Sequence, residues 1–156
     1  MRLAIISDTH LTSPDAWFEA VYATYLAPAD RLFHCGDSTS VTVWSYLVQH
    51  PGFEAVAGNS DAYDLATSLP AILERAIDGR RVVVVHGWGP RPGLSHRLAE
   101  ALSDRADILF FGHSHAFEDT TIGATRLINP GSLRPGGSLA LVDTGPTTWT
   151  VRRIAV

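Results

Sequence analysis

Short apolar runs along the chain each end on a side chain that can bind a metal ion. The runs are Leu3–Ser7, Arg31–Gly36, Phe53–Gly58, Val82–Val85 and Ile108–Gly112. Nearly unbroken Val, Ile, Leu and Phe residues predict strands that are buried on both faces. In sheets of such strands, ligands gather beyond the carboxyl ends of the strands. The pattern therefore predicts that these metal-binding side chains, although scattered along the chain, meet at one edge of one sheet.

Between the first three predicted strands lie segments whose apolar residues recur at helical spacing. A helix is expected from Pro14 to Ala27, with Ser13 as its N-cap and Pro14 at the first helical position. A second helix is expected from Val41 to Gln49, because its apolar residues form one stripe and Pro51 follows it. Alternating strands and helices with short links favour a parallel sheet with right-handed crossovers.

The second half of the chain has a different pattern. Asp78-Gly79 lies between Leu73–Ile77 and Arg80–Val85 and predicts a hairpin with a type I′ turn. One more helix is expected from Pro92 to Asp104. The last predicted strands are Phe117–Ile122, Thr125–Ile128, Ser138–Asp143 and Thr147–Ile154. The expected fold class is α/β, a four-layer α/β/β/α sandwich of two mixed sheets flanked by helices, in a single domain of residues 1–156.

Composition narrows the range of functions. A net charge of −4 argues against a broad basic face for nucleic acid. No apolar stretch approaches the roughly 20 residues that span a bilayer, so no membrane contact is expected. The first strand meets Asp8 at once and leaves no room for a signal peptide, and the single Cys35 rules out an internal disulfide. We therefore expect a cytoplasmic protein, and the sequence leaves homo-oligomers open.

The donors that follow the strands are carboxylates, imidazoles and one amide, without a thiolate. They are Asp8, His10, Asp37, Asn59, His86, His113 and His115. Such a set suits a hard-to-borderline divalent ion and not a cysteine-bound structural zinc. Seven ligands exceed the need of one tetrahedral ion but match two ions that share a bridging carboxylate. Gly36, Gly58 and Gly112 precede donors, where the strand must turn sharply.

These residues resemble the signature of the calcineurin-like metallophosphoesterases. The matching motifs are Asp8-x-His10, Gly36-Asp37, Gly58-Asn59-Ser60-Asp61, His86-Gly87 and Gly112-His113-Ser114-His115. Asn129-Pro130-Gly131-Ser132 resembles the small YfcE-like phosphodiesterase branch, in which this motif is expected to frame the site. The resemblance extends from the first strand to at least Ser132 and covers nearly the whole chain.

The resemblance implies two divalent metal ions per chain, with Mn expected and Ni, Fe, Co or Zn as alternatives. Asp8, His10 and His115 would hold one ion, and Asn59, His86 and His113 the other, with Asp37 bridging both. Asp37, Asn59 and His113 are also assigned to catalysis, in which a bridging hydroxide attacks phosphorus. The implied activity is hydrolysis of a small phosphodiester.

Several residues bear on substrate choice. Trp88 stands where many relatives have a second His, and substrate contact and packing are equally open for it. Arg91 and Arg134 lie in loops beyond strand ends and are candidate phosphate contacts. Ser60 stands where phosphoprotein phosphatases place a His, so their proposed general acid is missing.

Two further interpretations stay open. A relative in eukaryotic sorting complexes keeps this fold as a non-catalytic protein-binding scaffold with an impaired metal site, whereas all seven ligand positions are filled here. A phosphomonoesterase, nuclease or protein phosphatase is the second alternative. Outside the ligand set, His34 is expected to be a core residue that supports Asp37, while His50 and His96 are expected on the surface.

Overall fold

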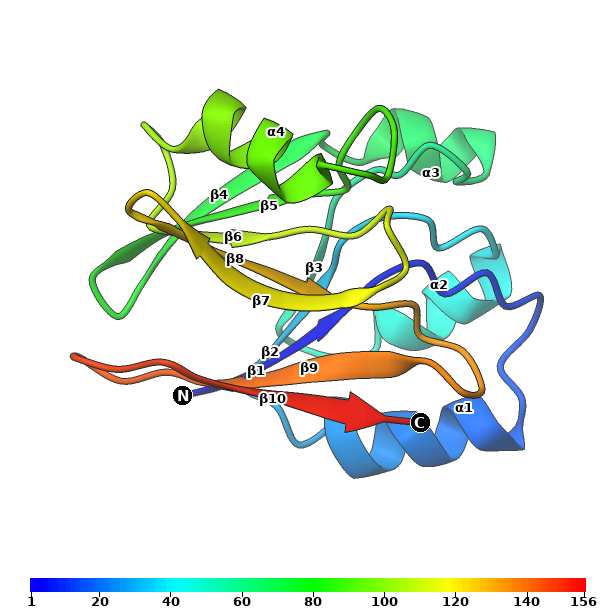
Figure 1. Ribbon diagram of the computed structural model, residues 1–156. Coiled ribbons are helices and arrows are strands. Elements are labelled where there is room, and N and C mark those ends of the chain that lie inside the picture. The colour runs from blue at the N-terminus through cyan, green and yellow to red at the C-terminus, as the bar shows by residue number, and fades with distance from the viewer.

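Two five-stranded β-sheets pack face to face in the computed structural model, which describes residues 1–156 (Figure 1). The strand order is β10-β9-β1-β2-β3 in the first sheet and β4-β5-β6-β8-β7 in the second. The strands are β1 (Arg2–Ile6), β2 (Arg31–His34), β3 (Phe53–Ala55), β4 (Ile72–Ile77), β5 (Arg80–Val85), β6 (Ile108–Phe110), β7 (Phe117–Ile122), β8 (Thr125–Pro130), β9 (Ser138–Asp143) and β10 (Thr150–Ala155).

The first sheet carries the predicted parallel βα units. Strands β1, β2 and β3 run parallel, and β9 joins β1 in the antiparallel sense. Helix α1 (Ala16–Val21) continues as the π-helix η1 (Tyr22–Leu26). Asp15, and not Ser13, is the N-cap of α1, because its carboxylate accepts a hydrogen bond from Phe18 N at 2.8 Å. Helix α2 (Val41–Leu47) begins after Ser40, which caps it.

The second sheet begins with the predicted hairpin of β4 and β5. Asp78 and Gly79 both have positive φ angles, 46° and 76°, as a type I′ turn requires. Helix α4 (Leu94–Leu102) connects β5 to the parallel strand β6. Helix α3 (Tyr63–Ser68) was not predicted, because it is short and buries only Leu65, which leaves no helical period to detect.

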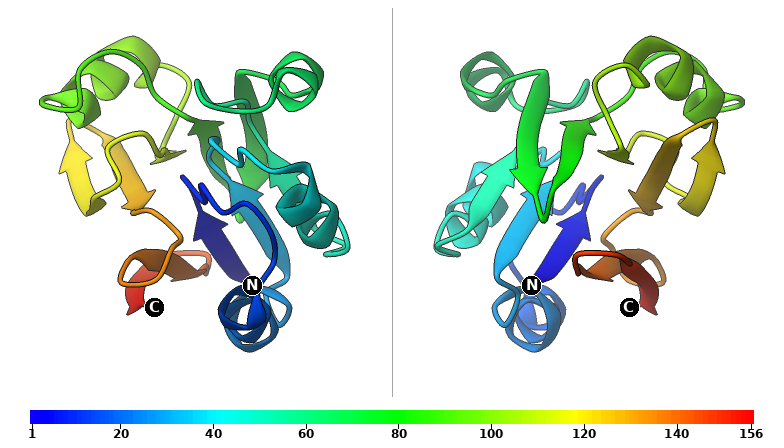
Figure 2. Two further views of the ribbon diagram at one scale, coloured as in Figure 1. Left: turned by 90° about the vertical axis from the view of Figure 1, so that its right-hand side faces the viewer. Right: turned by 90° about the vertical axis from the view of Figure 1, so that its left-hand side faces the viewer.

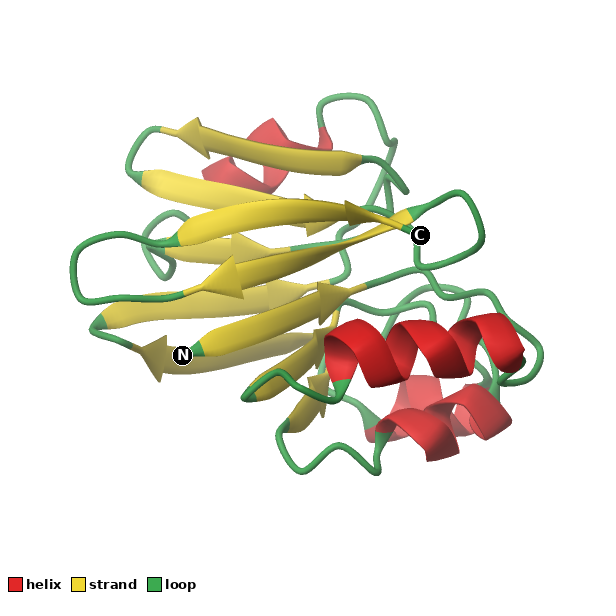
Figure 3. Ribbon diagram, turned by 90° about the horizontal axis from the view of Figure 1, so that it is seen from below, coloured by secondary structure: helices red, strands yellow, loops and turns green.

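Strand alternation builds the core in layers. In β1, Leu3 and Ile5 belong to the cluster between the sheets, whereas Ala4 and Ile6 belong to the cluster that includes Phe18 of α1. The valines of β5 divide between the inter-sheet cluster and the cluster beneath α4 in the same way. The predicted four-layer α/β/β/α sandwich is confirmed. Figure 2 shows the helices at the periphery of the two sheets, and in Figure 3 α1 with η1 forms the layer nearest the viewer.

Two histidines outside the predicted ligand set were expected on the surface, and only one of them lies there. His50 is buried and not on the surface, because its Nε2 lies 3.0 Å from the carbonyl oxygen of Ala29 and its Nδ1 accepts from Gly52 N. His96 is exposed on α4 as expected.

None of the helices combines the length and apolar character needed to cross a membrane.

Candidate metal centre

The predicted ligands leave their strands in an unusual backbone conformation. Five of the seven have left-handed φ angles: Asp8 (51°), His10 (40°), Asp37 (60°), His113 (66°) and His115 (63°). Outside this set, only Thr39 and Asp78 among the non-glycine residues have positive φ. Such conformations cost about 1–3 kcal/mol each and cluster at functional sites. The strained backbone therefore indicates that these loops are held in conformations that direct the side chains of the predicted ligands.

Glycines let these loops approach one another, as the sequence predicted. A Cβ atom on Gly58 would lie 2.1 Å from Asp37 N, and one on Gly112 would lie 1.9 Å from Ser7 Oγ. Neither distance is compatible with a side chain other than hydrogen. The glycines before Asn59 and His113 therefore allow ligand loops from both sheets to meet.

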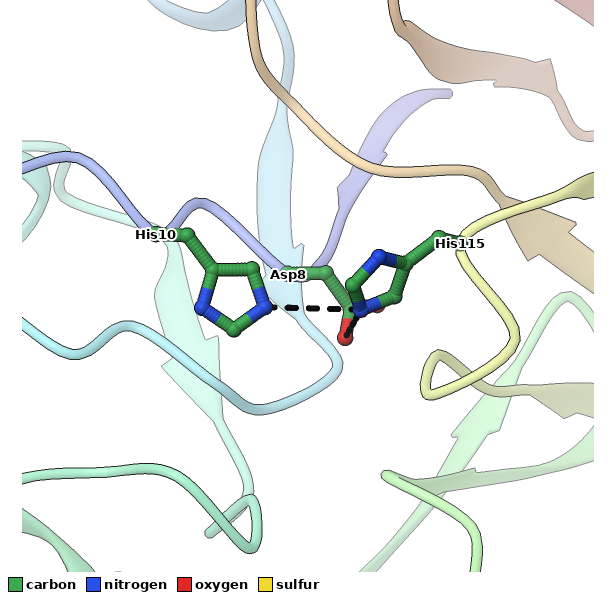
Figure 4. Close-up of side chains that lie close together, drawn as sticks. All are labelled: Asp8, His10 and His115. Atoms are coloured by element: carbon green, nitrogen blue, oxygen red, sulfur yellow. Dashed lines mark hydrogen bonds and ion pairs between the residues drawn. The ribbon is translucent and has the colours of Figure 1, made fainter. Parts of the chain in front are cut away.

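Asp8, His10 and His115 form the first cluster, on the loops after β1 and β6 (Figure 4). His115 Nε2 lies 3.2 Å from Asp8 Oδ1 and 3.4 Å from His10 Nε2. Asp8 Oδ1 is buried and has no hydrogen-bond partner. Burial raises the pKa of Asp8, although the charges of His86 and His115 and a hydrogen bond from Ser7 oppose this shift. A buried, unpartnered carboxylate oxygen beside two imidazoles fits a bound cation.

Asn59, His86 and His113 form the second cluster. Asn59 Oδ1 lies 2.9 Å from His86 Nε2 and 3.0 Å from His113 Nδ1. The other ring nitrogens lie 2.7 Å from the Cys35 carbonyl oxygen and 2.8 Å from the Gly89 carbonyl oxygen. Because a carbonyl oxygen only accepts, these two nitrogens carry the hydrogens. In these tautomers the nitrogens that face the amide oxygen carry lone pairs. Burial alone would lower the pKa of His86, but the hydrogen bond to Asp37 and the charges of Asp8 and Asp37 raise it. The three converging groups therefore favour a cation or an added proton between them.

Asp37 lies between the two clusters. Its Oδ2 atom is 3.4 Å from His86 Nε2 and 3.8 Å from His10 Nε2, and its Oδ1 accepts from Ser60 N at 2.7 Å. Burial alone would raise the pKa of Asp37, but the hydrogen bond and charge of His86, with Ser60 and His10, lower it to about 2. Asp37 Oδ2 thus faces one imidazole nitrogen of each cluster.

The Asn129–Ser132 motif frames the site, as the resemblance implied. Asn129 Nδ2 donates to the Gly112 carbonyl oxygen at 2.8 Å and lies 3.0 Å from Ser114 Oγ. Ser132 Oγ donates to the Asp8 carbonyl oxygen at 2.7 Å. The motif therefore holds the backbone of both loops that carry the first cluster.

Asp61 has a positioning role that the sequence analysis missed. Its Oδ1 accepts from Ser38 N at 2.6 Å and Thr39 N at 3.3 Å, and its Oδ2 accepts from Gly58 N at 2.6 Å. The carboxylate thereby ties the loop after Asp37 to the loop that contains Asn59. The available signal was an Asp in a turn-forming Asn-Ser-Asp sequence, a residue type that commonly bonds nearby backbone N–H groups.

His34 is fully buried in β2, as expected, but it supports the neighbours of the ligands and not Asp37 itself. Gly36 N donates to its Nδ1 at 3.1 Å, so Nε2 carries the hydrogen and donates to Thr9 Oγ1 at 2.6 Å. Burial lowers the pKa of His34 to about 4. The neutral ring therefore joins the loops after β1 and β2 beneath the site.

The candidate substrate contacts lie on two sides of the site. Arg91 Nη2 is 3.4 Å from His115 Nε2. Burial lowers the pKa of His115, and the charges of Arg91 and Arg134 lower it further while Asp8 opposes them. Both arginines are thus close enough to the first cluster to affect it. Trp88 lines the same hollow as His86, and the residue is 42% exposed.

Comparisons with known proteins agree with this geometry. The family model described as "Calcineurin-like phosphoesterase superfamily domain" matches residues 1–145. The probable metallophosphoesterase YsnB of Bacillus subtilis is 30% identical over 136 residues, which are 86% of this chain and 76% of that protein. Among solved structures, an archaeal phosphodiesterase has a TM-score of 0.74 at 21% identity and full coverage of both chains. Vps29 of Chaetomium thermophilum has a TM-score of 0.77 at 20% identity, over 99% of this chain and 97% of its own. At these identities the two structures show the fold alone.

Proposed function

Because this chain belongs to the calcineurin-like phosphoesterase superfamily, we propose that it is a metal-dependent phosphodiesterase that hydrolyses a small phosphodiester at a dinuclear centre. The observation that carries this proposal is the convergence of seven side chains that can bind a metal ion, four of which present an acceptor atom that has no hydrogen-bond donor beside it. Asp8 Oδ1 is unpartnered, and the acceptors of Asn59, His86 and His113 face one another. A bound cation satisfies such an arrangement.

The residues fit two divalent ions. Asp8, His10 and His115 would hold one ion and Asn59, His86 and His113 the other, with Asp37 between them; Mn is the expected metal. When bound, such ions polarise phosphoryl oxygens and lower the pKa of bound water. Arg91 and Arg134 add positive charge beside the first cluster, where they would bind the anionic oxygens of the substrate.

Two findings favour a diester over a monoester. The Asn129–Ser132 motif resembles the YfcE-like phosphodiesterase branch, and the archaeal neighbour of the same fold is described as a phosphodiesterase. The scaffold alternative has a fold relative in Vps29. It is disfavoured because all seven ligands are present and five of them are kept in strained backbone conformations, for which protein binding gives no reason.

The test is a metal-dependent activity screen. The protein is stripped with a chelator, reconstituted separately with Mn, Ni, Fe, Co or Zn, and assayed on bis(p-nitrophenyl) phosphate, p-nitrophenyl phosphate and an oligonucleotide. We expect Mn-dependent turnover that is fastest on the diester. Asp37→Ala should abolish turnover and lower metal content with a modest loss of stability, whereas Asp104→Ala, at an exposed position on another face, should do neither. Stoichiometric metal binding without turnover on any ester would favour the scaffold.

A further inference from the structure

A small apolar hollow opens beside the second cluster. It has a volume of about 300 Å³, which is at the lower end of the range for ligand pockets. Five of its seven lining residues are hydrophobic; the lining consists of Ala57, Ala71, Ile72, Val85, His86, Gly87 and Trp88. The start of β4, the end of β5 and the loop after β5 therefore enclose it.

The hollow and the second cluster share a wall. His86 lines the hollow and also places its Nε2 atom 2.9 Å from Asn59 Oδ1. Ala57, which also lines the hollow, directly precedes the Gly58-Asn59 turn. A phosphate group held at the second cluster would therefore lie next to this hollow, which is within reach of its ester substituents.

Charge divides the surroundings of the site into two sides. The lining of the hollow contains no arginine, lysine or carboxylate. The free positive charge lies on the other side, where Arg91 Nη2 is 3.4 Å from His115 Nε2. The anionic oxygens of a phosphodiester are drawn toward that cationic side, which leaves an uncharged ester group for the apolar side.

Trp88 indicates what kind of group the apolar side accepts. The residue is 42% exposed, although it follows directly on His86-Gly87 at the edge of the site. A large exposed aromatic surface beside an apolar hollow gains most when a flat ring covers it, because stacking adds to the burial of apolar area.

We propose that this hollow binds an aromatic ester group of the substrate, with Trp88 stacked on the ring, and that it makes the enzyme selective for aromatic over small alkyl phosphoesters. The inference rests on the proposed phosphodiesterase function, and it names the substrate class of that site. The phosphate oxygens face Arg91 and Arg134 while the ring enters the space between Ile72 and Trp88.

The experiment compares two phosphonates that cannot be hydrolysed, so binding is measured apart from catalysis. Calorimetry on the Mn-reconstituted protein should give a Kd for phenylphosphonate about tenfold below that for methylphosphonate, because only the phenyl group buries apolar surface. Ala71 is exposed, and Ala71→Trp should fill the hollow. We expect this variant to lose the phenyl preference while its Kd for methylphosphonate stays the same. Ala101→Trp, at an exposed position on α4, is the matched control and should keep the preference.

Trp88→Ala provides a second variant in case Ala71→Trp does not fold, and it too should lower the phenyl preference selectively. Equal binding of the two phosphonates by the unchanged protein, or a parallel loss of both affinities in the variants, would overturn the inference. The proposed function is tested separately by turnover of bis(p-nitrophenyl) phosphate. Turnover without a phenyl preference defeats only the inference, and a phenyl preference without turnover defeats only the proposed activity.

Discussion

The His113 imidazole donates a hydrogen bond from Nε2 to the carbonyl oxygen of Gly89 across 2.8 Å. This bond determines the tautomer, so Nδ1 presents its lone pair to Asn59 Oδ1 at 3.0 Å. The loop that contains Gly89 is in turn held from α4, because Arg97 donates to the carbonyl oxygens of Trp88 and Pro90. Arg97 therefore acts on the second cluster through the backbone of this loop.

Arg97→Ala should free the loop and weaken Mn binding by about tenfold. Removing a group that orients a metal ligand typically lowers metal affinity by this much or more. We expect kcat on a phosphodiester to fall with a smaller change in KM. Arg97→Lys, which can reach only one of the two carbonyl oxygens at a time, should be intermediate. Calorimetric Mn titration checks the affinity. Arg105→Ala removes an exposed arginine paired with Glu74 and is the control; equal Mn affinities in Arg97→Ala and this control would show that Arg97 does not position His113.

Asp61→Asn should lower stability as well as metal affinity. The carboxylate uses both oxygens to accept three backbone N–H groups, whereas an Asn side chain offers one oxygen and would turn an NH₂ group toward a donor. We expect a loss of about 1–3 kcal/mol in the free energy of unfolding. Urea unfolding in the presence of a chelator measures it without a contribution from bound metal. Asp64→Asn, an exposed substitution in α3, is the comparison, and similar losses in both variants would contradict the role of Asp61.

His34 should make the metal-free protein sensitive to mild acid. Its pKa is about 4 in the folded state against 6.5 for an unperturbed His, so between these pH values the unfolded chain binds a proton that the folded chain does not. The contribution of His34 to the free energy of unfolding is complete above pH 6.5. It falls by roughly 3 kcal/mol as the pH drops toward 4. Urea unfolding at several pH values should show a shallower decline for His34→Gln than for His96→Gln, which changes an exposed residue. Identical slopes would mean that His34 does not titrate in this way.

Turnover should depend steeply on the leaving group. Ser60 is too weak an acid to protonate it, and both oxygens of Asp61 are engaged as acceptors. His34 is buried and bonded to Thr9, and His96 is exposed on α4. We expect kcat to fall strongly as the pKa of the leaving group rises across substituted phenyl phosphodiesters, and alkyl diesters to react far more slowly. A flat dependence with chemistry rate-limiting would require a general acid that these residues do not include, and His34 and His96 would be the first to replace.

Local sequence determined the strands and most of the site. The apolar runs produced buried strands because they are short and rich in β-branched and aromatic residues, which pack well on a pleated sheet. Asp78-Gly79 produced a type I′ turn because both residues tolerate positive φ. The candidate ligands were identifiable because each lies in the loop that follows a strand. The donors follow strands of both sheets, so they meet where the loops of the two sheets come together and not at the edge of one sheet, as the pattern had predicted. The parallel pairing of β1 with β2, of β2 with β3 and of β5 with β6 brings the donors of each sheet to one end of that sheet.

Only the tertiary structure decided how those ligands are held. His50 is buried because distant backbone groups of Ala29 and Gly52 satisfy its ring, which no local pattern reveals. Asp61 and Arg97 bond to backbone atoms of other loops, so their roles depend on which loops lie side by side. The hollow beside Trp88 likewise exists only where β4, β5 and the turn after β3 come together. Residue types and their positions along the chain determine which chemistry is available, whereas packing between distant segments determines the orientation in which it is used.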